Sequence, residues 1–137
     1  MIGRYPGDSY AGGNPWQLLT AIYAKTFYQG ANALLESNGF QKEADKKAWF
    51  SLLKLKETAT LREQVQAAVQ AGDAVMNLLY SYVKGDGGHI AEQIDKNGGS
   101  QKSANDLTWS FANILGAMKE GKKAALGLAQ LAEPMTE

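Results

Sequence analysis

The fold class follows from residues 14–39, NPWQLLTAIYAKTFYQGANALLESNG. Asn14 suits the N-cap of a helix and Pro15 its first position. Ser37-Asn38-Gly39 is a typical helix stop. Between these ends, apolar side chains recur at the spacing of three and four that one buried helical face requires: Leu19, Ile22, Tyr23, Phe27, Ala31 and Leu34. We therefore expect one long helix here.

Further helices are expected on both sides of a glycine-rich segment. Helical periodicity covers about 42–55, 59–84 and 122–132. Another helix is expected to begin at Ser103, because Ser103 and Asp106 resemble a capping box. The last helix should end before Pro134. No strand pattern, repeat or low-complexity tract is evident. The sequence predicts an all-α fold in a single domain.

The composition narrows the classes of function. The 137 residues suffice for one modest domain. Fourteen Lys and Arg balance fourteen Asp and Glu, so the chain lacks the basic field of a generic nucleic-acid binder or of a protein adsorbed to an anionic membrane. No apolar run approaches the roughly 20 residues of a membrane span, and no signal-peptide pattern opens the chain. The lack of cysteine excludes disulfides and zinc–thiolate sites.

The first distinctive loop is residues 3–16, GRYPGDSYAGGNPW. Arginine and carboxylate side chains supply directional, charge-assisted hydrogen bonds, and tyrosine and tryptophan supply flat apolar faces. That mixture suits a neutral polyhydroxylated ligand such as a sugar. The alternative is that Arg4 and Asp8 form a pair that only ties the loop together.

The second loop, residues 85–109, reads GDGGHIAEQIDKNGGSQKSANDLTW. A carboxylate in such a loop, here Glu92, can act as a general base if it is held near a bound water. The alternative is an ordinary solvated loop residue. His89 is the single histidine and has no second ligand at metal-binding spacing, so we predict no metal site. No phosphate-binding, dinucleotide-binding, nucleophile-elbow or calcium-loop pattern occurs.

Together the two loops resemble a known family. GRYPGDSYAGGNPW is similar to a segment that precedes a barrel helix in glucoamylases, glycoside hydrolase family 15 of the fungal-like branch. HIAEQID followed by SANDLTWSFA resembles the later segment with that family's catalytic base and a substrate-contacting tryptophan. The resemblance runs from Gly3 to about Met118. It implies an (α/α)6 toroid of six inner and six outer helices, of which residues 1–137 would form a single partial domain, the C-terminal portion or roughly the final third.

The resemblance also implies an activity. Family members hydrolyse α-1,4 and, more slowly, α-1,6 glucosidic bonds from the non-reducing ends of starch-like chains, releasing β-glucose with inversion and without a cofactor. Glu92 matches the general base that activates water. The implied substrate-binding residues are Arg4, Asp8, Tyr10, Trp16 and Trp109, of which Arg4 would bind hydroxyls of the terminal glucose. Starch, maltooligosaccharide or glucose would be the partners.

This sequence departs from the family pattern at three points. Gly7 stands where fungal members usually carry Glu, and Asn105 where they often carry Arg, which puts fine substrate preference in doubt. Inversion needs two carboxyl groups about 6.5–9.5 Å apart, and the family's acid lies in an earlier Glu-Glu motif. No Glu-Glu pair occurs here. We therefore expect a C-terminal fragment that lacks the general acid and has negligible activity alone.

Two other interpretations remain open from the residues. One is a non-catalytic α-glucan-binding or regulatory remnant that holds sugar with Arg4, Trp16 and Trp109. The other is an unrelated helical interaction domain whose loops mimic the motifs. A partial toroid would also leave apolar helix faces exposed, which favours self-association. The family is commonly secreted or periplasmic, but nothing in this chain indicates a location.

Overall fold

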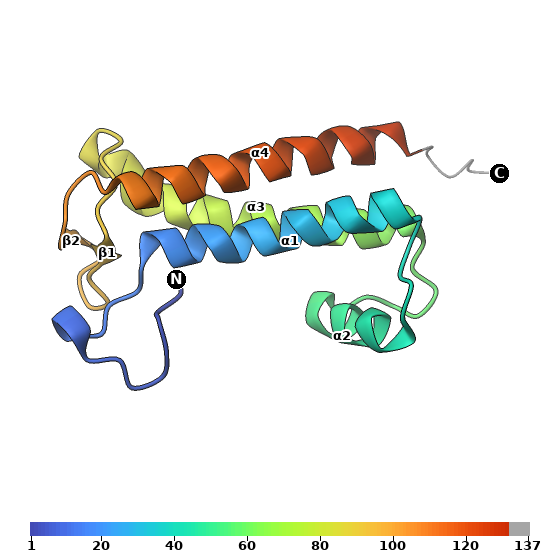
Figure 1. Ribbon diagram of the computed structural model, residues 1–137, viewed down its shortest axis with the longest axis horizontal. Coiled ribbons are helices and arrows are strands. Elements are labelled where there is room, and N and C mark those ends of the chain that lie inside the picture. Colours follow the sequence, from blue (N-terminus) through green and yellow to red (C-terminus); the bar gives the residue numbers. More distant parts are fainter. Residues whose placement is uncertain (132–137) are drawn as a thin grey trace.

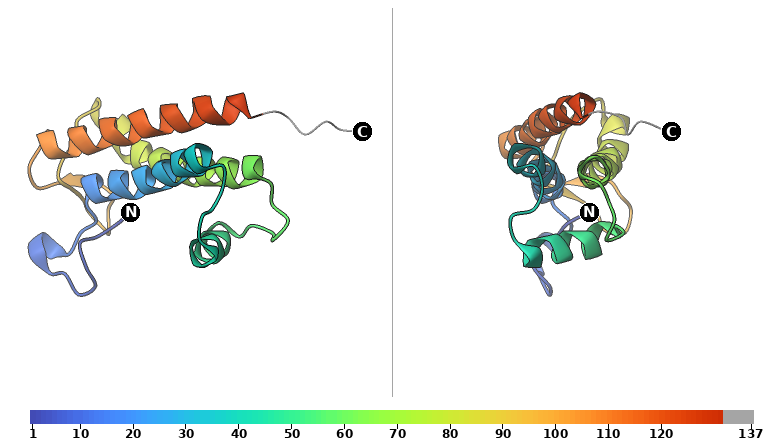
Figure 2. Two further views of the ribbon diagram at one scale, coloured as in Figure 1. Left: turned by 45° about the vertical axis from the view of Figure 1, so that its right-hand side comes forward. Right: turned by 90° about the vertical axis from the view of Figure 1, so that its right-hand side faces the viewer.

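Three long helices form the body of the protein in the computed structural model, which describes residues 1–131. They are α1 (Gln17–Ser37), α3 (Leu61–Val83) and α4 (Thr108–Gln130). Seen end-on, they stand at the corners of a triangle (Figure 2). The shorter α2 (Glu43–Leu53) crosses beneath α1 and α3. The prediction of an all-α architecture is confirmed apart from one two-residue strand pair described below.

Small residues let the three long helices approach closely. The fully buried alanines are Ala21, Ala24 and Ala31 in α1, Ala68 in α3, and Ala117 and Ala124 in α4. The ring of Tyr28 enters the space between α3 and α4, where a Cβ added to Gly72 would lie 2.5 Å from its Cε1 and one added to Gly121 3.0 Å from its Cζ. Larger side chains at these glycines would separate the helices. We call this packed region the helical body.

The start and the buried face of α1 differ from the prediction. The helix begins at Gln17 after an extended Trp16. The prediction that Asn14 is the N-cap of this helix is wrong, because the Asn14 side chain bonds instead to Ala11 and Gln93. Ile22 and Tyr23 are each 39% exposed. The buried apolar face is carried by Leu18, Ala21, Ala24, Phe27, Tyr28, Ala31 and Leu34.

The second half of the chain also departs from the expected boundaries. The prediction that a helix begins at Ser103 is wrong. Ser103 and Asp106 have φ angles of 68° and 49°, which a right-handed helix cannot contain. The helix α4 begins at Thr108 instead. The expected segment 122–132 continues the same helix up to Gln130, while Pro134 lies outside the described residues. The true capping box is Thr60 with Glu63, at the start of α3.

The loops gather at one end of the helical body (Figure 1). This polar end, residues 1–16 and 84–107, holds two single-turn 3-10 helices, η1 (Tyr10–Gly12) and η2 (Lys84–Asp86). The expectation of no strand is wrong here, because β1 (Gln93–Ile94) pairs antiparallel with β2 (Gln101–Lys102). Two-residue strands are too short to produce an alternating pattern in the sequence.

Candidate active site

Arg4 organises the first loop around its guanidinium. Its Cζ lies 4.6 Å from the ring centre of Tyr10, 5.2 Å from that of Trp16 and 5.5 Å from that of Tyr5. Cations are attracted to aromatic faces at these distances. We call Arg4 with Tyr5, Tyr10 and Trp16 the aromatic cradle. The two tyrosines are exposed, whereas Trp16 is buried.

Asp8 fixes Arg4 in this position. Arg4 Nε donates to Asp8 Oδ2 and Arg4 Nη2 to Asp8 Oδ1, both at 2.7 Å. The backbone N–H of Tyr10 adds a third bond to Asp8 at 3.0 Å. These bonds to its charged form, the Arg4 bond foremost, lower the pKa of Asp8 from 3.8 to about 2. The pair does tie the loop together, and it also leaves Arg4 Nη1 without a hydrogen-bond partner among residues 1–131.

Trp16 brings a second unused donor to the cradle. Its side chain is 8% exposed, and its Nε1 finds no acceptor in the described part of the chain. A buried indole N–H ordinarily has a partner. Trp16 Nε1 is itself closed to solvent, so the accessible contacts for a polyhydroxylated ligand are those of the exposed Arg4 and Tyr10.

Glu92 lies directly before β1 and is half-buried. Its carboxylate Oε2 accepts a hydrogen bond from Gln93 Nε2 at 3.1 Å and a short one from Ser103 Oγ. No donor within residues 1–131 bonds its other oxygen, Oε1. A carboxylate held through one oxygen, with the second free to accept a proton, has the form that a general base needs.

Backbone pairing joins the two loops into one unit. Trp16 forms a bridge with Gln93, flanked by Ile94 N donating to Pro15 O at 3.0 Å and Gln17 N donating to Glu92 O at 3.1 Å. The aromatic cradle and Glu92 therefore belong to the same end of the molecule, the left side of Figure 1. Of the predicted residues, this pairing brings together Arg4, Asp8, Tyr10, Trp16 and Glu92.

Trp109 stands apart from this unit. It lies in the first turn of α4, is 60% exposed and stacks on no other ring among the described residues. The segment before α4 is nevertheless tied to Glu92, whose backbone N–H donates to Ala104 O at 2.9 Å. The exposed ring of Trp109 therefore follows a segment whose backbone is hydrogen-bonded to Glu92.

The two departures from the family pattern occupy exposed positions. A Cβ added to Gly7 would meet no heavy atom within 4 Å, although the φ of 80° at this residue disfavours any side chain. Asn105 lines a polar hollow with Asp86, His89 and Asp106, where His89 Nδ1 lies 2.9 Å from both carboxylate oxygens of Asp106. Among residues 1–131, no group of three His, Cys, Asp or Glu side chains is placed to hold a metal ion.

The sequence does not predict the two polar residues that bond to Glu92, Gln93 and Ser103, or Asn14, which bonds to Gln93. Asn14 and Ser103 were predicted as helix caps, and Gln93 had no predicted role. In the structure Ser103 and Gln93 both donate to Glu92, and Asn14 donates to Gln93. Their only sequence signal is their position in the two loops, because irregular loops have no fixed spacing between hydrogen-bond partners, and Asn14 and Gln93 are 79 residues apart.

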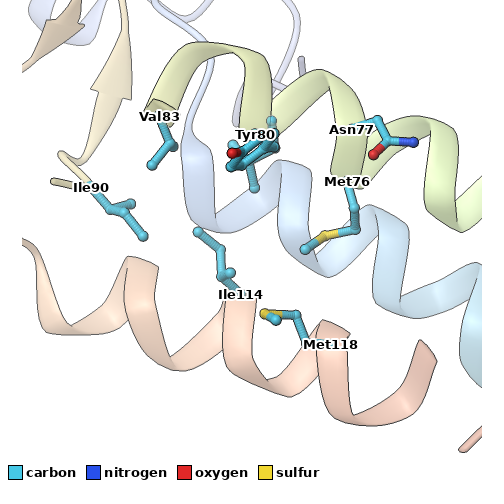
Figure 3. Close-up of a pocket in the computed structure, with 8 residues that line it drawn as sticks. Met76, Asn77, Tyr80, Val83, Ile90, Ile114 and Met118 are labelled. Atoms are coloured by element: carbon cyan, nitrogen blue, oxygen red, sulfur yellow. The ribbon is translucent and has the colours of Figure 1, made fainter. Parts of the chain in front are cut away.

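The other notable cavity is apolar. A groove of about 260 Å³ runs between α3 and α4, where Tyr80 and Val83 of one helix face Ile114 and Met118 of the other (Figure 3). With so few polar groups it fits apolar side chains better than a sugar. Separately, none of the described helices has the length and apolarity needed to cross a membrane.

Comparison with known proteins gives sequence matches over most of the chain. Residues 1–119 match the family described as Glycosyl hydrolases family 15. Glucoamylase-1 of Schizophyllum commune is 31% identical over 150 residues, which cover 99% of this chain and 25% of that protein. A glucoamylase of Neurospora crassa is 31% identical over 124 residues, or 85% of this chain and 20% of that one.

Solved structures agree with the sequence matches. The glycoside hydrolase family 15 glucoamylase from Hypocrea jecorina aligns with a TM-score of 0.79 at 29% identity, over 98% of this chain and 24% of that chain. The glucoamylase of Hormoconis resinae, with a TM-score of 0.76 at 22% identity, supports the fold alone. The predicted relation to part of an (α/α)6 toroid is confirmed. The chain spans only 20–25% of the length of these relatives.

Proposed function

Because the chain belongs to glycosyl hydrolase family 15, we propose that it forms the water-activating part of a glucoamylase-like active site. That site would hydrolyse terminal α-1,4-linked glucose from starch or maltooligosaccharides with inversion. The observation that carries the proposal is the Trp16–Gln93 pairing, because it joins a cradle suited to sugar with a carboxylate suited to proton transfer.

Glu92 would be the general base. Gln93 and Ser103 hold its Oε2, so Oε1 is left to accept a proton from the attacking water. Because inversion places this water on the opposite face of the sugar ring from the leaving oxygen, the base needs a fixed direction. The hydrogen bonds from Gln93 and Ser103 to Glu92 Oε2 provide this fixed direction.

Arg4 and the aromatic cradle would bind the terminal glucose. The free Nη1 of Arg4 is a donor for sugar hydroxyls, and the exposed Tyr10 offers apolar contact. Asp8 would keep Arg4 in place. Trp109 would act as a separate stacking surface for the sugar chain.

The general acid would come from chain beyond these 137 residues. Inversion requires a second carboxyl group about 6.5–9.5 Å from the base, and the Glu-Glu motif that supplies it in the family does not occur here. We therefore expect negligible turnover from the 137 residues alone. Removal of an essential proton donor typically lowers the rate by about 10²–10⁴-fold.

A chimera that supplies the missing general acid tests the proposed function. Residues 1–119 would replace the matching segment of the Hypocrea jecorina glucoamylase, and glucose release from maltooligosaccharides would be followed with its anomeric form. We expect the chimera to release β-glucose and its Glu92→Gln variant to release almost none. Equal rates from the two would refute Glu92 as the base. Saturable maltose binding without turnover in either would instead favour the non-catalytic glucan-binding alternative.

We also propose self-association of the 137-residue chain through the groove between α3 and α4. The chain covers only 24% of the Hypocrea jecorina glucoamylase, so helix faces that would pack against the rest of the larger fold face solvent here. Tyr80 and Met118 in the groove are 63% and 57% exposed. Light scattering should show a dimer that Met118→Lys dissociates, whereas Lys119→Met should not. A stable monomer at high concentration would refute the proposal.

A further inference from the structure

Two buried amides connect the loop of the aromatic cradle to Glu92. Asn14 is 3% exposed and Gln93 is fully buried. Asn14 Nδ2 lies 3.2 Å from Gln93 Oε1, and Gln93 Nε2 lies 3.1 Å from Glu92 Oε2. Both bonds run in the same direction, with each NH2 group donating toward Glu92. Buried polar chains of this kind are strong only when every member is oriented correctly.

The orientation is set at the Asn14 end by the backbone. The second hydrogen of Asn14 Nδ2 is donated to Ala11 O at 2.9 Å, and Asn14 Oδ1 accepts from the Lys96 N–H at 3.3 Å. A flipped Asn14 would place oxygen against a carbonyl and NH2 against an N–H. Since neither backbone group can exchange its role, the Asn14 amide has one stable orientation, and so does Gln93 after it.

We propose that Asn14 is a positioning residue for Glu92. It fixes the Gln93 amide so that a donor, and not an oxygen, faces Glu92 Oε2, which keeps Oε1 free for water. This role rests on the proposed function of Glu92 as the general base. Because Asn14 lies two residues before Trp16 in the loop of the aromatic cradle, the same contact also links the sugar-binding side of the site to the base.

A double-mutant cycle tests the direction of the relay. Asn14→Asp presents only acceptors to Gln93, which must turn and set its oxygen against the Glu92 carboxylate. Adding Glu92→Gln supplies an NH2 group for that oxygen. We expect Asn14→Asp to lower the melting temperature and the double variant to regain about 4 °C of the loss. No recovery would overturn the proposal.

Asn32→Asp is the matched control. Asn32 is also a buried amide, 5% exposed, but it donates to Glu120 at 2.8 Å in the helical body. Adding Glu92→Gln to Asn32→Asp should recover nothing, and an equal recovery would overturn the proposal. The recovery in the Asn14 cycle should also persist in about 1 M salt, where the Debye length is about 3 Å. If salt removed it, simple charge repulsion and not the relay would be its cause.

A spectroscopic measurement covers the case in which Asn14→Asp does not fold. In ¹⁵N-labelled protein, Glu92→Gln should shift the side-chain NH2 signals of Gln93 strongly and those of Asn14 more weakly, while those of Asn32 stay in place. An unmoved Asn14 signal would overturn the relay. Neither this experiment nor the stability cycle requires substrate.

The chimera then separates the relay from the function. In it we expect Asn14→Asp to lower kcat by about tenfold with KM nearly unchanged, as for loss of a transition-state interaction, and Asn32→Asp to leave kcat unchanged. Hydrolysis that Asn14→Asp does not slow would overturn the role of Asn14 alone. A stability cycle that shows coupling in a chimera that hydrolyses nothing would overturn the proposed function, and with it the catalytic role of the relay.

Discussion

In the helical body, α1, α3 and α4 approach each other over alanine and glycine, and the ring of Tyr28 enters the space beside Gly72 and Gly121. At the polar end, the chain is held by bonds between Asn14, Gln93, Glu92 and the backbone of distant loops. Apolar packing is non-directional and tolerates no extra volume, whereas hydrogen bonds are directional and tolerate no reversal. Substitutions should therefore destabilise the helical body when they change side-chain volume, and the polar end when they reverse a donor and an acceptor.

The largest effect expected in the helical body is loss of apolar volume. Leu79 is 2% exposed in α3, and Leu79→Ala should lower the free energy of unfolding by about 2–5 kcal/mol. Leu126→Ala, at a side chain that is 58% exposed, should change it by no more than about 0.5 kcal/mol. Urea unfolding followed by circular dichroism measures both. Similar losses for the two would mean that the body is not packed as described.

A smaller loss should follow from added volume in the same region. Gly72→Ala places a Cβ 2.5 Å from the Tyr28 ring, and overpacking of about 1–3 kcal/mol should exceed the roughly 1 kcal/mol that alanine contributes to helix propensity. At Gly85 a Cβ meets nothing within 4 Å, so Gly85→Ala is the control. A Gly72→Ala protein more stable than wild type would show that α3 can move away from the ring.

The smallest effect concerns the polar end and is local. The pKa of Asp8 is lowered from 3.8 to about 2 by Arg4, so its contribution to stability is complete above pH 3.8 and is lost as the pH falls toward 2. In that window we expect the aromatic cradle to open, with a change in Trp16 fluorescence before the helices unfold. Asp8→Asn should abolish this step. If the variant kept the step, another carboxylate would be responsible.

How far the sequence predicts each region depends on the distance between partners. Helical periodicity identified α1, α2 and α3 because the partners in a helix are three and four residues apart. The polar end could not be assembled this way: Asn14 and Gln93 are 79 residues apart, so local pattern assigned Asn14 to a helix cap. The two motifs select Arg4, Asp8 and Glu92 as candidates through resemblance, but no spacing rule shows that Trp16 pairs with Gln93. The roles of these residues and of Trp109 stay predictions.

The bond from Gln17 N–H to the Glu92 carbonyl also has a consequence for the order of folding. The first turn of α1 takes part of its hydrogen bonding from a segment that is synthesised after α3, so that turn cannot be completed until a long loop has closed. Contacts at such separation tend to form late. Weakening the Trp16–Gln93 junction should therefore speed unfolding while leaving the folding rate almost unchanged.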